Sequence, residues 1–460
     1  MPVVLRIAAI MLAVALATAT VRAQPVLEAA YVLLGGSGAV ARTIYSGTTD
    51  CPALSINGAA QTMSVRMAPQ TGKDAPFPVL VCELALPADA NSVILNGQPL
   101  PLPPAGTLTT VAVIGDTGCR LKAGKEKDPK DKDYEEDGKF QDCKSDWPFS
   151  ALAASVAEEK PQLLVHVGDY IYRESRCPPH DKGCKGSPHG DTWLTWQADF
   201  FAPAKPLLVA APWIAVRGNH EICSRAGAGF MLFLDPALAV NRQPAPCAAL
   251  IDTFSVTVGG QQFIMLDSSD APDECVSAKK AAQGKKKKKE AVCDLKTNLA
   301  PDCPKSGCSA KDYADQFAAM KPADGAILVT HRPAWGFKNK GDPLNATLQL
   351  ALTAWNGQLP PGFALALAGH IHIWEVLGFK DKGAPQFVLG NGGTLLTHKV
   401  ERKLKGLKVG SREVGDFKTS HKWGFTIFTR ATNGWTATAY SVKGKDKFDC
   451  SAAQGVVSCP

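Results

Sequence analysis

Seven side chains that can bind metal ions stand in five short segments, each directly after an apolar run. These side chains are Asp116, Asp169, Tyr172, Asn219, His331, His370 and His372. All of them offer oxygen or nitrogen atoms, which suit Mn, Fe and Zn better than soft metal ions. A lone Asp or Asn after a strand is more often a turn former, and it is the recurrence in five segments that favours metal binding. The pattern predicts one shared metal site.

The donor set is typical of a centre for two metal ions. A carboxylate such as Asp169 can bridge two cations, one through each oxygen. Two metals about 3.5–4 Å apart can activate a water and hold the attacking and leaving oxygens of a phosphoryl transfer. The residues therefore predict two-metal phosphoesterase chemistry.

A layered α/β core is expected to position these segments. From residue 106 to residue 460, strand-like runs alternate with helix-like segments such as residues 147–159, and this alternation favours an α/β fold. In such sheets, ligands lie beyond the carboxyl ends of the strands, where all five segments stand. Residues 24–105 contain short β-type runs broken by Gly, Pro, Asn and Asp. They predict a small N-terminal all-β domain, for which a sandwich is one arrangement.

Residues 1–23 are expected to form a secretory signal peptide. Arg6 precedes an apolar stretch that runs to Ala17, and small residues lead to Ala23. That stretch is too short for a membrane anchor, and no later apolar run is long enough to cross a bilayer. The sequence therefore predicts a secreted or periplasmic protein with no membrane span once the signal is removed.

The 14 cysteines are expected to form local disulfides, because an exported chain folds in an oxidising compartment. The expected pairs are Cys51–Cys82, Cys119–Cys143, Cys177–Cys184, Cys223–Cys247, Cys275–Cys293, Cys303–Cys308 and Cys450–Cys459. The group from Cys275 to Cys308 could pair otherwise. A zinc site at Cys303 and Cys308 is the weaker alternative, since their spacing lacks a second matching pair.

Two charged inserts, residues 120–142 and 270–311, interrupt the predicted core on the same rim as the metal-binding segments. The second contains a lysine run, which is favoured as a solvated loop. A patch that attracts polyanions near the site is the alternative. No aromatic residues interleave the lysines, and removing Arg6 and Arg22 lowers the formal charge from +7 to about +5. A nucleic-acid partner is therefore not expected, and the oligomeric state is left open.

The five segments resemble the motifs of the purple acid phosphatase branch of the calcineurin-like metallophosphoesterase superfamily. The resemblance covers about residues 107–400. The motifs are GDxG at 115–118, GDxxY at 168–172, GNH[DE] at 218–221, VxxH at 328–331 with Leu in first place, and GHxH at 369–372. The wider superfamily usually has a histidine where this chain has Gly118, and Tyr172 offers a ligand instead. The resemblance implies a layered β-sandwich flanked by helices and a secreted two-metal phosphatase that hydrolyses phosphate monoesters.

Carried over by motif position, the resemblance also implies a role for each ligand. The first metal would bind Asp116, Tyr172 and His372, the second would bind Asn219, His331 and His370, and Asp169 would bridge them. Bound as phenolate, Tyr172 would make the first site the more anionic one. That asymmetry favours Fe(III) in the first site with Fe(II), Zn(II) or Mn(II) in the second. His220 would bind phosphate or protonate the leaving group, and Glu221 would orient its neighbours.

The small phosphorylated substrate is less well defined by the sequence. Family members often carry a further histidine about ten residues after the position of His331, where this chain offers Lys338 and Lys340 as substrate-binding candidates. A lysine can hold phosphate as a point charge. It is a poor proton donor at low pH because its ordinary pKa is about 10.4. A phosphodiesterase or nucleotidase on the same metal core, or a secreted binding protein built on a degenerate domain, are the alternatives.

Two aromatic residues close to the second motif are expected to pack rather than to bind metal. His166 stands inside an apolar run and is expected in the core. Tyr170 should point away from Tyr172, because side chains alternate along an extended segment. An offset in register would make Tyr170 the ligand instead.

Overall fold

The structure of the chain is a computed structural model. It describes residues 24–124, 138–272, 276–277, 292–293, 310–338, 341–344, 346–400, 402–442 and 447–460. The expected signal peptide and most of the two inserts lie outside these residues.

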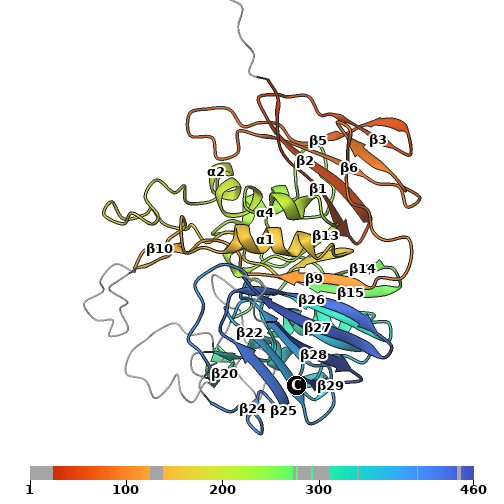
Figure 1. The fold of residues 1–460 in the computed structure, drawn as a ribbon, viewed down its shortest axis with the longest axis vertical. Coiled ribbons are helices and arrows are strands. Elements are labelled where there is room, and N and C mark those ends of the chain that lie inside the picture. Colours follow the sequence, from red (N-terminus) through yellow and green to blue (C-terminus); the bar gives the residue numbers. More distant parts are fainter. Residues whose placement is uncertain are drawn as a thin grey trace, which may run out of the picture.

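Two large sheets make up the centre of the molecule (Figure 1). The first has 11 strands in the order β29 (Val456–Ser458), β28 (Lys447–Ala453), β27 (Gly434–Ser441), β26 (Gly424–Ala431), β9 (Thr110–Ile114), β12 (Leu163–His166), β13 (Trp213–Ala215), β1 (Val26–Gly35), β2 (Gly38–Ser46), β6 (Leu80–Ala85) and β5 (Ser64–Met67). The second has eight strands in the order β14 (Phe254–Val258), β15 (Gln261–Leu266), β18 (Ala326–Thr330), β21 (Phe363–Ala368), β23 (Gln386–Leu389), β22 (Trp374–Phe379), β25 (Arg412–Ser420) and β24 (Lys408–Val409). Strands β9, β12 and β13 are parallel to one another, and so are β15, β18, β21 and β23.

Smaller elements complete the described chain. The short strands are β3 (Ala53–Ile56), β4 (Ala59–Thr62), β7 (Val93–Leu95), β8 (Gln98–Pro99), β10 (Leu121–Lys122), β11 (Lys139–Phe140), β16 (Val276–Ser277), β17 (Val292–Cys293), β19 (Phe337–Lys338) and β20 (Asp342–Pro343). The helices are α1 (Phe149–Glu158), α2 (Trp193–Trp196), η1 (Gln197–Phe201), α3 (Lys205–Leu208), η2 (Asn219–Glu221), α4 (Gly227–Phe233), α6 (Ala310–Ala319), α7 (Thr347–Ala351) and η4 (Thr353–Trp355).

The molecule has four layers: helices, the first sheet, the second sheet and helices. The central strands are apolar on both faces, so each sheet packs on both sides. Val111 and Val113 of β9 belong to the core between the two sheets. Ala112 and Ile114 of the same strand belong to the core under α1, α3 and α4. In the second sheet, Leu328 of β18 faces a third core that includes residues of α6 and α7. Strands buried on both faces are typical of parallel sheets covered by helices.

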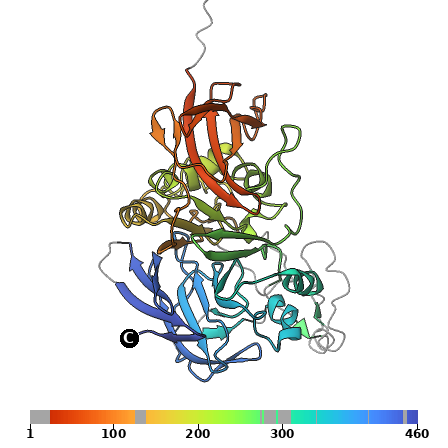
Figure 2. The ribbon, with the colours of Figure 1, turned by 90° about the vertical axis from the view of Figure 1, so that its right-hand side faces the viewer.

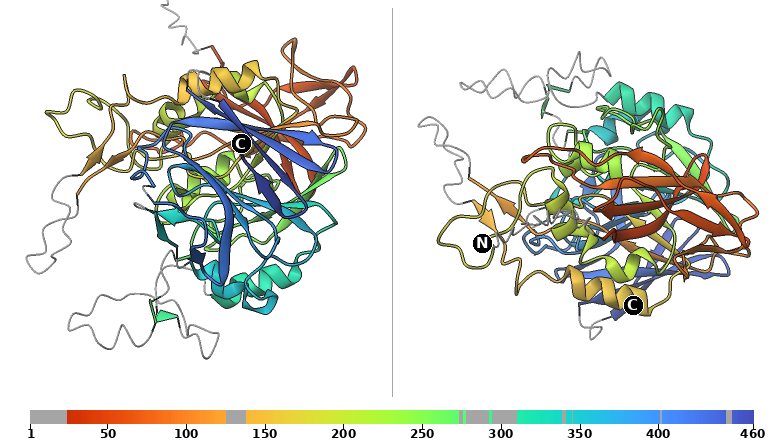
Figure 3. Two further views of the ribbon diagram at one scale, coloured as in Figure 1. Left: turned by 60° about the horizontal axis from the view of Figure 1, so that its bottom comes forward. Right: turned by 90° about the horizontal axis from the view of Figure 1, so that it is seen from above.

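The views agree with this layering. Figure 2 shows α6 and α7 (teal) and the C-terminal strands (dark blue) on opposite sides of the second sheet. Both panels of Figure 3 place α1 (yellow) and the teal helices on opposite sides of the molecule. The predicted layered β-sandwich flanked by helices is therefore confirmed.

The N-terminal β region is continuous with the first sheet. Strand β1 pairs in parallel with β13 through Leu33 and Trp213. On the other side of β1, strands β2, β6 and β5 extend the sheet. The four strands β4, β3, β7 and β8 form a small separate sheet next to it. The predicted N-terminal β region is present, and the domain boundary at residue 105 stays a prediction.

Buried charges fasten the N-terminal strands to α4. Glu83 accepts hydrogen bonds from Arg42 (2.9 Å) and Arg66 (2.7 Å), and both guanidinium groups are buried. Arg42 also donates to the carbonyls of Phe233 (3.0 Å) and Asp235 (2.7 Å). Both cations and their carboxylate are therefore paired, as buried charges must be.

Five of the seven expected disulfides are confirmed. They are Cys51–Cys82, Cys119–Cys143, Cys177–Cys184, Cys223–Cys247 and Cys450–Cys459. The pairing of the other four cysteines falls outside what the structure describes. Within the described residues, no helix combines the length and apolar character that a membrane span requires.

Candidate metal centre

The five segments meet where the carboxyl ends of the two sheets come together. Asp116 follows β9, Asp169 follows β12 and Asn219 follows β13, all in the first sheet. His331 follows β18 and His370 follows β21, both in the second sheet. Hydrogen bonds between backbones connect the loops, from Asp116 N to Gly168 O (2.9 Å) and from Gly369 N to His331 O (2.9 Å). Each sheet thus supplies one side of the site.

Three of the candidate ligands have left-handed backbone conformations. The φ angles are 57° at Asp116, 59° at Asp169 and 71° at His370. Such conformations cost a non-glycine residue about 1–3 kcal/mol and concentrate at functional sites. The turn at His370 also places its backbone N–H 2.9 Å from Asp116 Oδ2, which joins the two sheets across the site.

Asp116, Asp169 and His372 form one group of potential ligands, whose donor atoms lie within 4.8 Å of one another. The Tyr172 hydroxyl lies 2.8 Å from Asp116 Oδ1, 2.7 Å from Asp169 Oδ2 and 2.9 Å from His372 Nε2. His372 Nδ1 donates to Leu395 O at 2.9 Å, which leaves the Nε2 lone pair facing the group. The four side chains proposed for the first metal are therefore together.

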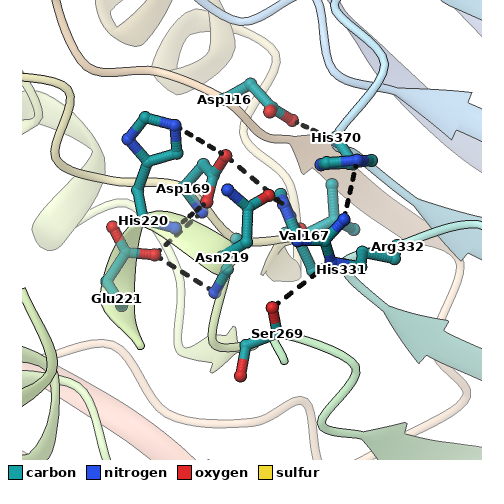
Figure 4. Close-up of polar contacts among 12 residues, drawn as sticks. Asp116, Val167, Asp169, Asn219, His220, Glu221, Ser269, His331, Arg332 and His370 are labelled. Carbon is teal, nitrogen blue, oxygen red and sulfur yellow. Dashed lines mark hydrogen bonds and ion pairs between the residues drawn. The ribbon is translucent and has the colours of Figure 1, made fainter. Parts of the chain in front are cut away.

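Asp169, His331 and His370 form the second group, again with donor atoms within 4.8 Å. His331 Nε2 lies 3.0 Å from Asn219 Oδ1 and 3.3 Å from Asp169 Oδ2 (Figure 4). His331 Nδ1 donates to Val167 O at 2.8 Å, which fixes the orientation of the ring. The two groups share Asp169, as a bridging carboxylate requires.

The electrostatics of the site suit cations. Burial raises the pKa of the Tyr172 phenol, and the charges of Asp116 and Asp169 raise it further. Burial would lower the pKa of His331, but Asp169 and its hydrogen bond raise it to about 9. Without metal ions, a protonated His331 thus offsets part of the carboxylate charge, and Tyr172 stays a neutral phenol; metal binding would release both protons. The donors present therefore fit two metal ions.

The third cluster of possible ligands, Cys177, Asp181 and Cys184, is of another kind. Its two cysteines form a disulfide and cannot bind metal as thiolates.

Glu221 orients the loop that carries Asp169, as expected. Its carboxylate accepts hydrogen bonds from the backbone N–H groups of Asp169 (3.1 Å), Gly218 (3.1 Å), Tyr170 (2.9 Å) and Ile171 (3.0 Å). Burial is the main cause that raises the pKa of Glu221 to about 8, with a further contribution from Asp169.

His220 lies beside the first group. Its backbone N–H donates to Asp169 Oδ1 at 2.8 Å, and its ring centre lies 3.8 Å from that of Tyr172. Its Nδ1 lies 2.6 Å from Glu174 Oε1. The side chain is buried and held on two sides, so its position is compatible with the expected contact to substrate.

His166 and Tyr170 lie in the core as predicted. Their rings stack at 3.9 Å, and Tyr170 also packs against Phe200. His166 Nε2 lies 3.1 Å from Thr117 Oγ1. Tyr172, and not Tyr170, reaches the ligand group.

The structure does not test the role of the two lysine candidates. Lys338 is partly buried at the end of β19, which pairs with β20. Lys340 lies outside the described residues. Their substrate-binding role stays a prediction.

Sequence reasoning missed four residues that contact the site. Asp199 accepts hydrogen bonds from the backbone N–H groups of Cys119 (3.2 Å) and Tyr172 (2.8 Å) and also pairs with Arg173. The other three are Arg120, Arg225 and Arg332, each of which contacts a motif residue. The arginines could have been found from the sequence, because each is a basic residue shortly after one of the motifs. No sequence feature indicated Asp199.

Comparison with known proteins agrees with this geometry. The sequence model of the calcineurin-like phosphoesterases matches residues 109–374. Among solved structures, the chain is similar to the purple acid phosphatase PPD1 from yellow lupin (Lupinus luteus) seeds. The TM-score is 0.52 at 13% identity, over 92% of this chain and 74% of that one. It is also similar to PhoD, with a TM-score of 0.50 at 13% identity, over 94% of this chain and 91% of that one.

No curated protein sequence matches significantly. At 13% identity the two structural relatives show the fold alone. The family match covers more than half of the chain and includes the two ligand groups that share Asp169. The chain therefore belongs to the calcineurin-like phosphoesterase family, as a metal-dependent phosphoesterase with a candidate site for two metal ions.

Proposed function

We propose that the protein is a secreted phosphatase of the purple acid phosphatase type, which hydrolyses phosphate monoesters at a two-metal centre. The observation that carries the proposal is the sharing of Asp169 between the two ligand groups, together with Tyr172 in the first. When bound, two metal ions supply an activated water and neutralise phosphate charge. Asp116, Tyr172 and His372 would hold the first ion, Asn219, His331 and His370 the second, and Asp169 both.

The charges of these ligands support iron in the first position. Asp116 and a Tyr172 phenolate would give that position two anionic ligands of its own, whereas the second has an amide and two imidazoles. A trivalent ion gains more than a divalent ion from the anionic set. We therefore assign Fe(III) to the first position and Fe(II), Zn(II) or Mn(II) to the second.

His220 is the residue to which we assign the proton transfer. Hydrolysis adds water to phosphorus and breaks the P–O bond to the alcohol, whose oxygen must then gain a proton. The contacts of His220 to Glu174 and to the Tyr172 ring hold the imidazole beside the ligand group. A second role, a hydrogen bond to the phosphoryl group, is compatible with the same position.

The disulfides support a location in an oxidising compartment. Five are described, and such bonds persist outside the cytosol. Together with the expected signal peptide, they support a secreted or periplasmic enzyme.

The experiment that tests the proposal is metal analysis of the purified protein with its absorption spectrum and an ester screen. We expect iron plus a second metal, a visible phenolate-to-iron band, and faster hydrolysis of an aryl phosphate monoester than of the matching diester. Tyr172→Phe should lose the band. An active, colourless protein without iron would refute the iron assignment, and a faster diester reaction would favour a phosphodiesterase or nucleotidase.

A further inference from the structure

Three arginines surround the candidate metal centre, and each follows one of its motifs along the chain. Arg120 follows the segment of Asp116, Arg225 follows that of Asn219, and Arg332 is the neighbour of His331. Guanidinium groups keep their charge at any pH at which the protein is folded. Their contacts show where these charges lie.

Arg120 lies against the first ligand group. Its guanidinium carbon is 4.6 Å from the centre of the Tyr172 ring. Its backbone N–H donates to Gln141 Oε1 at 3.1 Å, and the adjacent Cys119 is tied to Cys143 by a disulfide. Arg120 Nε is buried and has no hydrogen-bond partner among the described residues. A buried donor without an acceptor is costly, so an acceptor supplied by a ligand would stabilise this position.

Arg225 lies against His220. Its Nη1 donates to Asn219 O at 2.9 Å, and its Nη2 lies 2.9 Å from His220 Nδ1. It also pairs with Glu174. Burial is the main cause that lowers the pKa of Arg225; the charges of Asp169 and Tyr172 raise it, and those of Arg120 and Arg332 lower it, so both other cations lie within electrostatic reach of Arg225.

Arg332 lies against the second ligand group. Its Nη1 is 3.1 Å from His370 Nε2, and its Nε donates to Ser269 O at 3.2 Å (Figure 4). Arg120 and Arg332 therefore approach the centre from its two ends, and Arg225 approaches from the side of His220.

We propose that Arg120, Arg225 and Arg332 bind the phosphoryl oxygens of the substrate and select doubly charged phosphate monoesters over singly charged diesters. The proposal rests on the proposed phosphatase function and names the residues that set its specificity. The three arginines act in addition to the metal ligands and replace none of them.

The chemistry of the two ester classes gives the reason. A monoester dianion has three non-bridging oxygens, so an oxygen would remain for the arginines even if the metal ions took two. A diester has two such oxygens and one negative charge less. The planar guanidinium matches phosphoryl oxygens through paired hydrogen bonds. Three neighbouring cations repel one another, and a dianion offsets that repulsion more than a monoanion does.

The test compares Arg120→Gln and Arg332→Gln with Arg242→Gln, which removes the same charge from an exposed loop after α4. In the first two variants we expect kcat/KM for an aryl phosphate monoester to fall roughly 10- to 100-fold. For the matching diester, kcat/KM should change less than about 3-fold. A diester has one negative charge and one non-bridging oxygen fewer, so it depends less on the arginines. Binding of inorganic phosphate to the metal-loaded protein, measured by calorimetry, should weaken by the same factor as the monoester reaction. The metal content of all variants should stay at the wild-type value.

Two outcomes would overturn the proposal. Equal losses for both esters would show that the arginines support the metal centre in general, and unchanged monoester kinetics would show that they do not touch substrate. If a glutamine variant loses metal, the matching Arg→Lys variant takes its place; it keeps the charge but loses the paired hydrogen bonds, so a smaller loss, again confined to the monoester, is expected. A metal-loaded wild type that hydrolyses neither ester would refute the proposed function, whereas its phosphate affinity relative to the variants would still decide the role of the arginines.

Discussion

The backbone of Tyr172 packs directly against Gly118, in space that a side chain at residue 118 would fill. A Cβ atom at residue 118 would lie 2.7 Å from Tyr172 N and 2.6 Å from Tyr170 O. A histidine at this position, which the first motif of the wider superfamily usually has, would begin with that same Cβ atom. The tyrosine segment occupies the space that a side chain at residue 118 would need.

Gly118→Ala should therefore disturb the first ligand group. The new methyl group must push the Tyr172 segment away from Asp116, which moves the phenol out of reach of a metal. We expect at least a roughly 10-fold loss of kcat/KM and loss of the visible band, with the second metal retained. Metal analysis and the absorption spectrum check this. Gly106→Ala, where no atom lies within 4 Å of the added Cβ and the backbone is not left-handed, is the control. Wild-type colour in Gly118→Ala would contradict the expected displacement.

Asp169→Ala should remove both metals together. Asp169 belongs to both ligand groups, so its loss takes one anionic ligand from each. We expect less than about one-tenth of the wild-type metal content and of the wild-type hydrolysis rate. Asp181→Ala is the matched control, because Asp181 belongs to the cluster whose cysteines form a disulfide. Full activity of Asp169→Ala would show that hydrolysis does not depend on a metal pair bridged by this carboxylate.

Glu83→Gln should loosen the N-terminal strands without touching the metal centre. The change leaves the buried cations Arg42 and Arg66 without their shared carboxylate. Breaking a buried pair costs roughly 3–5 kcal/mol, which calorimetry should record as a large fall in Tm. Asp89→Asn, at an exposed position of the same region, serves as the control. An unchanged Tm, or a loss of metal at low temperature, would contradict the expectation.

Glu375 should make stability depend on pH. Its side chain is buried, and burial raises its pKa to about 8. Oε1 accepts from Phe337 N at 3.1 Å, and Oε2 has no partner among the described residues. The folded protein therefore keeps a proton that the unfolded chain loses near its ordinary value of about 4.5. The stabilisation from the protonated group is complete below that value and is lost as the pH rises towards 8.

Glu375→Gln should abolish this dependence. We expect the Tm difference between the variant and the wild type to move in favour of the variant from pH 5 to pH 8. The free-energy change should be roughly 1–3 kcal/mol. Thermal unfolding at several pH values measures it, with Glu413→Gln as a control, since Glu413 is a more accessible carboxylate paired with Lys380. Parallel pH profiles for wild type and Glu375→Gln would contradict the expected linkage.

Much of the site was predictable because the signal is local. Asp116, Asp169, Asn219, His331 and His370 each stand just after the strand that presents them. An apolar strand and the ligand that follows it lie within one short segment, so the pattern can be recognised from the sequence alone. The five confirmed disulfides are local in the same sense, as each joins neighbouring cysteines along the chain. The sequence by itself thus determined the layered fold class and the residues that meet at the strand ends.

Contacts between distant segments were decided by the tertiary structure alone. The pairing of Leu33 with Trp213 joins the N-terminal strands to the first sheet, and no feature of either segment specifies the other. Asp199 reaches the Tyr172 backbone from η1, and Arg120 reaches the Tyr172 ring from the loop after the first motif. Such contacts depend on how two sheets and their helices pack, which the spacing of residues along the chain does not contain. The sequence was enough to identify the metal-binding side chains. The residues that surround them, including the arginines that would meet a substrate, are placed there by the packing of distant segments.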